Sequence, residues 1–427
     1  MYFFVRSFIF SYFLCLIFGC SLEKAIDLPT GIWRAEIALQ GQVLPFNFEL
    51  DQPEDKTYRI TVHNGEERII IDEVLIIGDS IFANMQVYDT QIRAKIGVDQ
   101  LNGYWIKNYE PDHRYPFIAN HNISYRFDPN PEPPTESISG KWEVQFSEDT
   151  AISVGIFEIS QEQLTGTFLT TKGDYRYLQG VQSGDQVKLS AFDGAHAFLF
   201  EANLKEDGSL QGVFYSSRAW QENWVATRND QAQLPNSDSL TYLIEGYERL
   251  EFSFPDLNGK MVSLSDSLFH NKIIVLQIFG TWCPNCIDET KFLANWYDQN
   301  KSRGVEIIGL AYEKKTAFDY ARTRVNKMIN RLGVNYKFVI AGTSDKIAAS
   351  KTLPMLNHVM AFPTTIFLNP SGEVQRIHTG FTGPGTGHYY QQFMDQFNTT
   401  IDKLLLEQST LEEEMVDSLS SNGPAQL

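Results

Sequence analysis

Short segments of alternating apolar and polar residues fill positions 30 to 228 of this 427-residue chain. In the first half of this region they read FNFEL, YRITV, RIIIDEVLII, SIFANMQVY and QIRAKI, and turn-forming residues such as His63-Asn64-Gly65 separate them. Alternation with a period of two is typical of strands that bury one face, and no helical spacing interrupts it. The pattern predicts an antiparallel all-β region, folded as a barrel or a sandwich.

The β region contains an internal repeat, with one copy at residues 30–128 and the other at residues 139–228. Gly31-Ile32-Trp33 aligns with Gly140-Lys141-Trp142, and later segments match at the same offset. The copies are joined by DPNPEPPT, residues 128–135, which is a stiff and extended linker. We interpret the tryptophans of both copies as core residues, with a ligand cleft as the alternative: Trp33, Trp105, Trp142, Trp220 and Trp224.

A second pattern follows a polar linker at residues 229–250. Residues 273–279, IIVLQIF, have the composition of a buried strand, and apolar residues at helical spacing come after them. Across residues 251–406 the pattern predicts an α/β domain with the order β-α-β-α-β-α-β-β-α. Residues 407–427 are acidic and lack a core pattern, so we expect a disordered tail.

The candidate chemistry lies where the first buried strand gives way to a helix, at Trp282-Cys283-Pro284-Asn285-Cys286. Pro284 suits a first helical turn, because its missing N–H is not needed there. Cys283 then stands at the helix N-terminus, where free N–H groups and the helix dipole favour a thiolate. Two intervening residues let one sulfur attack a mixed disulfide that the other has formed. We expect Cys283 to attack from an exposed turn and Cys286 to resolve the intermediate.

Two alternatives for the cysteine pair are a zinc site and a purely structural disulfide. Tetrahedral zinc needs four ligands, whereas the sequence offers no second CxxC and no histidine pair. The scattered histidines of the β region, such as His63 and His196, lack ligand spacing. A bridge between residues this close would close too small a loop to stabilise the fold much. We therefore favour redox chemistry and expect neither a metal nor a cofactor.

Together, the WCPNC segment after a buried strand and the later Phe362-Pro363-Thr364-Thr365 resemble the TlpA/ResA-like branch of the thioredoxin superfamily. The resemblance runs from about Phe252 to Leu406. It implies a thioredoxin fold and thiol–disulfide oxidoreductase activity on disulfide-containing protein substrates. It also implies a cis Phe362-Pro363 bond opposite the dithiol, with Trp282, Pro284, Phe362 and Pro363 contacting substrate. The alternative for Pro363 is a proline that merely opens an edge strand.

Glu289 lies three residues beyond Cys286 on the same helical face. The resemblance implies that this acid takes part in thiol proton transfer; the alternative is a solvated carboxylate of the first helical turn. Its neighbour Asp288 is expected only to interact with the helix dipole. Thioredoxin itself has an aspartate at the position of Gln277, and glutamine cannot take a proton. A proton-transfer step would then fall to Glu289 or to water.

Residues 1–20 have the features of a signal peptide: Arg6, an apolar run to Phe18, and a final Gly19-Cys20. This ending resembles a bacterial lipobox, in which Cys20 becomes the lipidated first residue. An ordinary cleaved signal and an uncleaved anchor are the alternatives. The apolar run is shorter than the roughly 20 residues that span a bilayer.

Charge and cysteine content limit the range of possible functions. The net charge is −18 and no basic run occurs, which argues against nucleic acid as a partner. Of the four cysteines, Cys15 and Cys20 lie in the N-terminal segment, so one pair is left for thiol chemistry. We expect a lipid-anchored, periplasm-facing protein of the bacterial cell envelope that reduces protein disulfides and is re-reduced by a membrane thiol donor. A disulfide oxidase or isomerase, and a ligand- or partner-binding lipoprotein with an accessory redox domain, are the alternatives.

Overall fold

The computed structural model describes residues 28–421, except for 55–56, 86, 111, 162 and 217–219. The predicted signal peptide and the lipidation site at Cys20 therefore lie outside the described residues. Within the described part of the chain, no helix is both long enough and apolar enough to cross a bilayer.

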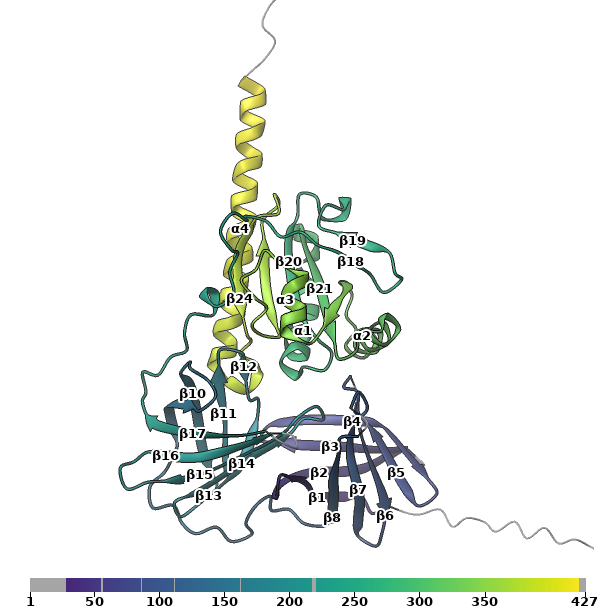
Figure 1. Ribbon diagram of the computed structural model, residues 1–427, viewed down its shortest axis with the longest axis vertical. Helices are drawn as coiled ribbons and strands as arrows, with labels where there is room; N and C mark the ends of the chain where they lie inside the picture. The colour runs from purple at the N-terminus through teal and green to yellow at the C-terminus, as the bar shows by residue number, and fades with distance from the viewer. Residues whose placement is uncertain are drawn as a thin grey trace, which may run out of the picture.

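The first β unit is a closed antiparallel barrel in which β1 pairs with β8 (Figure 1). Its strands are β1 (Gly31–Leu39), β2 (Gln42–Glu54), β3 (Thr57–Asn64), β4 (Glu67–Ile77), β5 (Ser80–Asn84), β6 (Thr90–Ile96), β7 (Gln100–Lys107) and β8 (Arg114–His121). Alternate residues of each strand point inward, so the apolar positions of the sequence pattern meet in one core. Trp33, Phe46 and Phe48 are among the side chains that fill it.

The second β unit forms a sheet with the order β10-β9-β17-β16-β15-β14-β13-β11-β12. Because β10 also pairs with β11, the ends of the sheet meet, and we call this unit the second barrel. Its strands are β9 (Gly140–Phe146), β10 (Ser153–Ser160), β11 (Gln163–Thr170), β12 (Gly173–Asp174), β13 (Leu178–Ser183), β14 (Gln186–Phe192), β15 (Ala197–Leu204), β16 (Leu210–Ser216) and β17 (Trp220–Arg228).

The first strands of the two barrels have the same local structure. The indole N–H of Trp33 donates to the carbonyl of Pro29 at 3.1 Å, and that of Trp142 donates to Ile138 at 2.9 Å. Both tryptophans are buried, as are Trp105 and Trp224. Trp220 is the exception, because 47% of its surface is exposed.

The remaining part of the chain is the predicted α/β domain with a thioredoxin-like arrangement. Its elements are β18 (Ser253–Pro255), β19 (Met261–Ser263), β20 (Ile273–Phe279), α1 (Pro284–Asn300), β21 (Val305–Glu313), α2 (Phe318–Leu332), β22 (Lys337–Thr343), α3 (Lys346–Thr352), β23 (Thr364–Leu368), β24 (Val374–Thr379) and α4 (His388–Ser421). Short 3₁₀ turns lie at Ser237–Ser239, Ser267–Phe269, Lys301–Arg303 and Pro384–Thr386. The predicted fold class, an all-β tandem repeat followed by a thioredoxin fold, is confirmed.

A central sheet with the order β22-β21-β20-β23-β24 organises this domain. Strands β20, β21 and β22 are parallel, whereas β23 and β24 run antiparallel to their neighbours. Every residue of β20 and of β23 is buried, in agreement with their mostly apolar sequences. The chain passes from the carboxyl end of β20 through a short turn into α1. The two cysteines therefore lie at the carboxyl-terminal end of this central strand.

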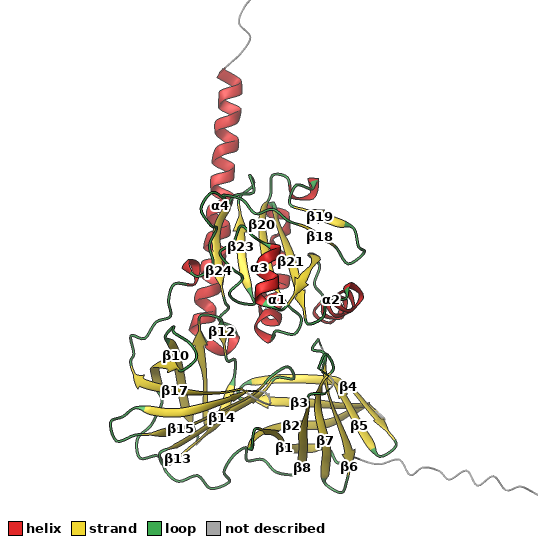
Figure 2. Cartoon of the chain, in the orientation of Figure 1, coloured by secondary structure: helices red, strands yellow, loops and turns green. Residues whose placement is uncertain are grey.

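The expectation of a disordered tail from Glu407 is wrong as far as Ser421, because α4 continues to that residue (Figure 2). The tail includes several Glu and Leu residues and Met415, which favour helices, and contains no Gly or Pro before Gly423. Lys403 also pairs with Glu407 one turn later, at 3.7 Å. Extending a helix that is already formed costs far less than nucleating one, so no apolar core pattern is required.

The α/β domain rests on both barrels (Figure 1). Helix α2 contacts the first barrel through Lys327 with Glu73 at 2.8 Å and Arg331 with Asp72 at 2.7 Å. Helix α1 contacts the second barrel, whose β12 lies close to the start of this helix. The cysteine pair therefore faces the second barrel.

Candidate active site

Cys283 is the N-cap residue of α1, and Cys286 lies in the first turn. The backbone N–H of Cys286 donates to the Cys283 sulfur at 3.3 Å. Pro284 occupies the first helical turn, as the sequence predicts. Both thiols are free in the structure. The Cys283 sulfur thus accepts an N–H group at the positive end of the helix.

Phe362 and Pro363 lie directly opposite the dithiol. The peptide bond between them is cis, and the thiol of Cys283 donates to the Phe362 carbonyl oxygen at 3.3 Å. The Phe362 ring packs edge-on against Trp282, with 5.5 Å between ring centres. Trp282 is fixed in turn by its indole N–H, which donates to the Tyr312 carbonyl at 2.8 Å. These four residues and the cysteines, separated in the sequence, form one cluster.

Cys286 is fully buried, one turn deeper than Cys283. Burial raises the pKa of its thiol well above the usual value, and the neighbouring Cys283 sulfur raises it further. Cys286 therefore stays protonated at neutral pH until a base takes its proton. The nearby carboxyl group of Glu289 also disfavours the Cys286 thiolate.

Glu289 is completely buried, so the alternative of a solvated carboxylate is wrong. Thr365 donates to one carboxyl oxygen at 2.6 Å, and Gln277 donates to the other at 2.8 Å. Burial raises the pKa of Glu289 to about 7, although these two donors act in the opposite direction. A carboxyl group with this pKa can gain or lose a proton near neutral pH, which suits a general acid or base.

Gln277 links the buried groups behind the dithiol. Its side-chain oxygen accepts from Tyr336 at 3.2 Å and from Thr290 at 3.2 Å. Its amide N–H donates to Glu289 on the other side. Gln277 thus orients Glu289 without exchanging protons itself. Sequence reasoning missed Thr365 and Tyr336 because nothing in the local pattern distinguishes them from core residues.

A second buried carboxylate, Glu313, shapes the turn before the cysteines. It accepts from the backbone N–H and from the hydroxyl of Thr281, both at 2.9 Å. Burial raises the pKa of Glu313 to about 6. The adjacent Lys314 lies over the Trp282 ring, with its ammonium nitrogen 3.9 Å from the ring centre. Burial lowers the pKa of Lys314.

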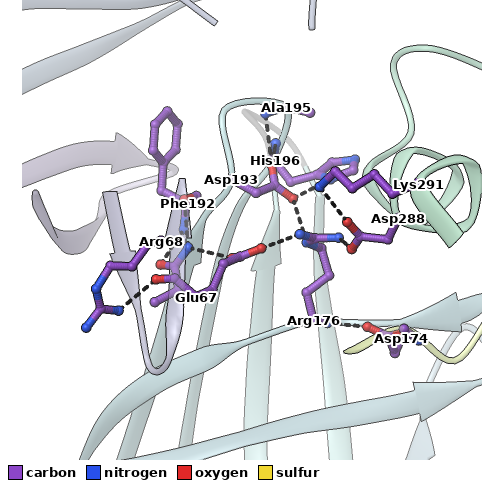
Figure 3. Close-up of polar contacts among 12 residues, drawn as sticks. Glu67, Arg68, Asp174, Arg176, Phe192, Asp193, Ala195, His196, Asp288 and Lys291 are labelled. Atoms are coloured by element: carbon purple, nitrogen blue, oxygen red, sulfur yellow. Dashed lines mark hydrogen bonds and ion pairs between the residues drawn. The ribbon is translucent and has the colours of Figure 1, made fainter. Parts of the chain in front are cut away.

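Arg176 of the second barrel joins the three structural units in one buried ion-pair network (Figure 3). It pairs with Asp288 of α1 and with Glu67 of the first barrel, and its Nε lies 4.0 Å from Asp193. Lys291 also pairs with Asp288, at 3.1 Å. The expectation that Asp288 interacts only with the helix dipole is therefore wrong. Sequence reasoning could not find this partner, which comes from a different domain.

The second barrel also covers the cysteine turn. The Asn285 side chain donates to the Asp174 carbonyl at 3.0 Å, and the Asp174 carboxylate accepts from Gly383 N at 2.6 Å. Only 6% of Cys283 is exposed, which corrects the expectation of an open turn. A cavity of about 380 Å³ between the turn and the barrel nevertheless includes Cys283 in its lining. Within the described residues, no group of His, Cys, Asp or Glu side chains is arranged to hold a metal ion.

The fold and this cluster define a thioredoxin-type oxidoreductase: a dithiol at a helix N-terminus beside a cis-proline strand. Comparison with known proteins gives the same class. The Redoxin family model matches residues 245–391. Thiol-disulfide oxidoreductase ResA of Bacillus subtilis (strain 168) is 31% identical over 157 residues, which cover 36% of this chain and 79% of that protein. The chain belongs to the ResA-like family of thiol-disulfide oxidoreductases.

One further relative and one solved structure are also similar to parts of this chain. ResA of Halalkalibacterium halodurans is 29% identical over 135 residues, covering 32% of this chain and 68% of that protein. A crystal structure of a thiol:disulfide interchange protein of the thioredoxin family from Chlorobium tepidum TLS is 20% identical and covers 37% of this chain and 95% of that one, with a TM-score of 0.28. Each of these three proteins matches about a third of the chain.

Proposed function

We propose that Cys283 and Cys286 carry out thiol–disulfide exchange, with Cys283 as the attacking and Cys286 as the resolving thiol. The observation that carries this assignment is the position of the Cys283 sulfur. It lies 3.3 Å from the Cys286 N–H nitrogen and 3.3 Å from the Phe362 carbonyl, next to the cis bond to Pro363. Cys283 also borders the cavity, whereas Cys286 is fully buried behind it.

The reaction takes two steps. The Cys283 thiolate attacks a substrate sulfur, the substrate S–S bond breaks, and the second substrate sulfur leaves as a thiolate that takes a proton from water. Cys286 then gives its proton to Glu289 and attacks the Cys283 sulfur, which releases the first substrate sulfur as a thiolate. Two electrons have passed to the substrate, and a Cys283–Cys286 disulfide remains. The pKa of Glu289, about 7, supports its role as the proton acceptor.

The direction of electron flow that we propose is reduction of substrate disulfides. The similarity to ResA and the resemblance to the TlpA/ResA-like branch support this direction. The reduction potential tests this direction. A reduction potential of about −270 mV supports a reductant, and one of about −120 mV would identify an oxidant.

A variant pair tests the roles of the cysteines. Cys283→Ser removes the attacking sulfur and should abolish reduction of insulin disulfides. Cys286→Ser keeps the attacking sulfur but cannot resolve, so it should accumulate mixed disulfides that non-reducing electrophoresis detects. Tyr104→Ala, an exposed position of the first barrel, serves as the control and should reduce insulin at the normal rate. Full activity in either cysteine variant would rule out the proposed mechanism.

We place this activity in the bacterial cell envelope, on a protein held to the membrane by a lipid on Cys20. The signal-like sequence of residues 1–20 and the similarity to ResA support this location. A membrane thiol donor would then re-reduce the Cys283–Cys286 disulfide after each cycle.

Replacing Cys20 tests the anchor. Cys20→Ala removes the only sulfur that a lipobox at this position could modify, so the protein should move from the detergent-extractable membrane fraction to the soluble fraction. Cys15→Ala is the matched control and should leave the protein in the membrane fraction. Unchanged membrane association of the Cys20 variant would exclude lipidation at this site.

A further inference from the structure

The cavity beside Cys283 is built by two domains. We call it the redox chamber and define it by Trp282, Cys283 and Phe362 on one side and by Tyr175, Phe198 and Trp220 of the second barrel on the other. Its volume of about 380 Å³ lies within the range of about 300–1,000 Å³ that is typical of small-ligand sites. The chamber therefore has room for a few residues of a substrate but not for the face of a folded protein.

The second barrel is held in place over the dithiol. Asn285, which lies between the two cysteines, donates to the Asp174 carbonyl at 3.0 Å. The buried ion pair between Arg176 and Asp288 ties the same barrel loop to α1 (Figure 3). A substrate disulfide must therefore reach Cys283 through the chamber, since only 6% of this residue is exposed.

Several charged side chains of the chamber already bind partners within the protein. Lys172 pairs with Asp149 at 2.8 Å, and His196 lies 3.3 Å from Asp193. Glu222 accepts from the backbone of Glu148 at 2.7 Å. Recruiting these groups to a charged ligand would break existing bonds, so the chamber is poorly suited to select a substrate by charge.

The aromatic side chains supply the recognition surface instead. Tyr175 and Phe198 pack edge-to-face with 5.1 Å between ring centres, and both are only partly buried. Trp220 is 47% exposed, although the four other tryptophans of the barrels are buried. On the opposite side, Trp282 and Phe362 meet edge-on beside the sulfur. Burying a large apolar side chain among such rings is favourable because it removes apolar surface on both partners from water.

We propose that the redox chamber binds the disulfide of a short, flexible peptide segment that carries a large apolar side chain next to its cysteine. This inference rests on the exchange reaction proposed above and names its substrate class. The cysteine sulfur of the segment meets Cys283, and the neighbouring side chain packs against Trp220 and the rings beside it. The atoms and electrons balance as in that reaction: one substrate S–S bond breaks, a Cys283–Cys286 bond forms, and two electrons pass to the segment.

Two disulfide-linked peptides of equal length and charge, with either Phe or Ser next to the cysteine, test the proposal on the full-length reduced protein in detergent. We expect kcat/KM to be about tenfold higher, or more, for the Phe peptide. Trp220→Ala should lower this preference severalfold, mainly by raising KM for the Phe peptide. Tyr104→Ala, an equally exposed aromatic position outside the chamber, should leave the preference unchanged.

Equal kcat/KM values for the two peptides, or an unaltered preference in the Trp220 variant, would overturn the proposal. Faster reduction of glutathione disulfide than of the Phe peptide would point to a small anionic substrate and would also overturn it. The same holds if native ribonuclease A is reduced as fast as the Phe peptide. These outcomes differ from failure of the exchange reaction itself, in which no peptide is reduced and Cys283→Ser has no effect.

Discussion

Glu289 shows how burial changes the chemistry of a single residue. A glutamate on the exposed face of a helix would be ionised at neutral pH. Here the carboxyl group contacts the paired residues Gln277 of β20 and Thr365 of β23, which both donate to it. Loss of hydration raises its pKa to about 7, and this brings its proton exchange into the pH range of the proposed reaction.

Glu289 should therefore make the folding stability depend on pH. Its pKa in the folded state, about 7, lies above the unperturbed value of 4.5, so the folded state binds more protons between these values. Stability is then greatest below about pH 4.5 as far as this group is concerned, and it falls as the pH rises toward 7. Between pH 4.5 and 7 the free energy of unfolding of the wild-type protein should fall by about 3 kcal/mol relative to that of Glu289→Gln. Urea unfolding at several pH values measures this difference.

Thr365→Val provides a second readout for the same group. It removes the donor to one Glu289 oxygen, a bond that lowers the pKa of this carboxyl group, so the pKa should rise further. If Glu289 accepts the Cys286 proton, the pH at which the second exchange step accelerates should rise with it, and Glu289→Gln should lose this dependence. A pH profile of mixed-disulfide resolution that is the same in all three proteins would contradict the role of Glu289.

Helices in the α/β domain begin and end at residues that the sequence marks clearly. Helix α1 starts at the Cys283 N-cap with Pro284 in its first turn, and α2 stops at Gly333. Gly333 adopts the left-handed conformation with φ of 65°, which a residue with a Cβ atom populates only at a cost. This termination allows the chain to turn back into β22, an edge strand of the central sheet.

Gly333→Ala should consequently destabilise the protein by about 1 kcal/mol, measured as a shift in the urea midpoint. The open space around Gly333 leaves no steric clash to add to this cost. Asn326→Ala is the matched control, because Asn326 is exposed in the same helix and alanine is the better helix former. A Gly333 variant as stable as the control would show that the backbone there relaxes freely.

At the scale of the whole molecule, Arg176 connects the two barrels and the redox domain (Figure 3). Although burial lowers its pKa, the charges of Asp288 and Glu67 raise it above the usual value for arginine. The carboxylate of Asp174, two residues earlier, is also buried, and burial raises its pKa to about 6. A charge cluster of this kind is stable only while every partner is present, because each ion has lost its hydration.

Arg176→Met should leave Asp288 and Glu67 buried without their cation, at a cost of about 3–5 kcal/mol to the contact between the units. The second barrel should then separate more readily from α1, and alkylation of Cys283 should become faster. Lys291→Met removes a half-exposed partner of Asp288 and should cost less than about 1 kcal/mol. Equal alkylation rates in both variants would show that Arg176 does not hold the barrel over the dithiol.

Features that depend on a few neighbouring residues can be predicted from the sequence alone. A period of two predicts the strands of both barrels, and the repeat of Gly31-x-Trp33 at Gly140-x-Trp142 predicts two similar units. A buried strand that ends in WCPNC predicts a dithiol at a helix N-terminus, because strand, turn and proline signals are all local. The resemblance to the TlpA/ResA-like branch predicts Phe362 and Pro363 as further residues of the site, and the structure places them opposite the cysteines.

The surroundings of the dithiol come from contacts between distant parts of the chain. The burial of Glu289 depends on Thr365, 76 residues away, and the pairing of Asp288 depends on Arg176, 112 residues away. The low exposure of Cys283 depends on a barrel that the chain completes long before it reaches the cysteine. No local periodicity encodes such contacts, because Glu289 and Thr365 meet only when the α/β domain folds, and Arg176 and Asp288 meet only when that domain packs against the second barrel.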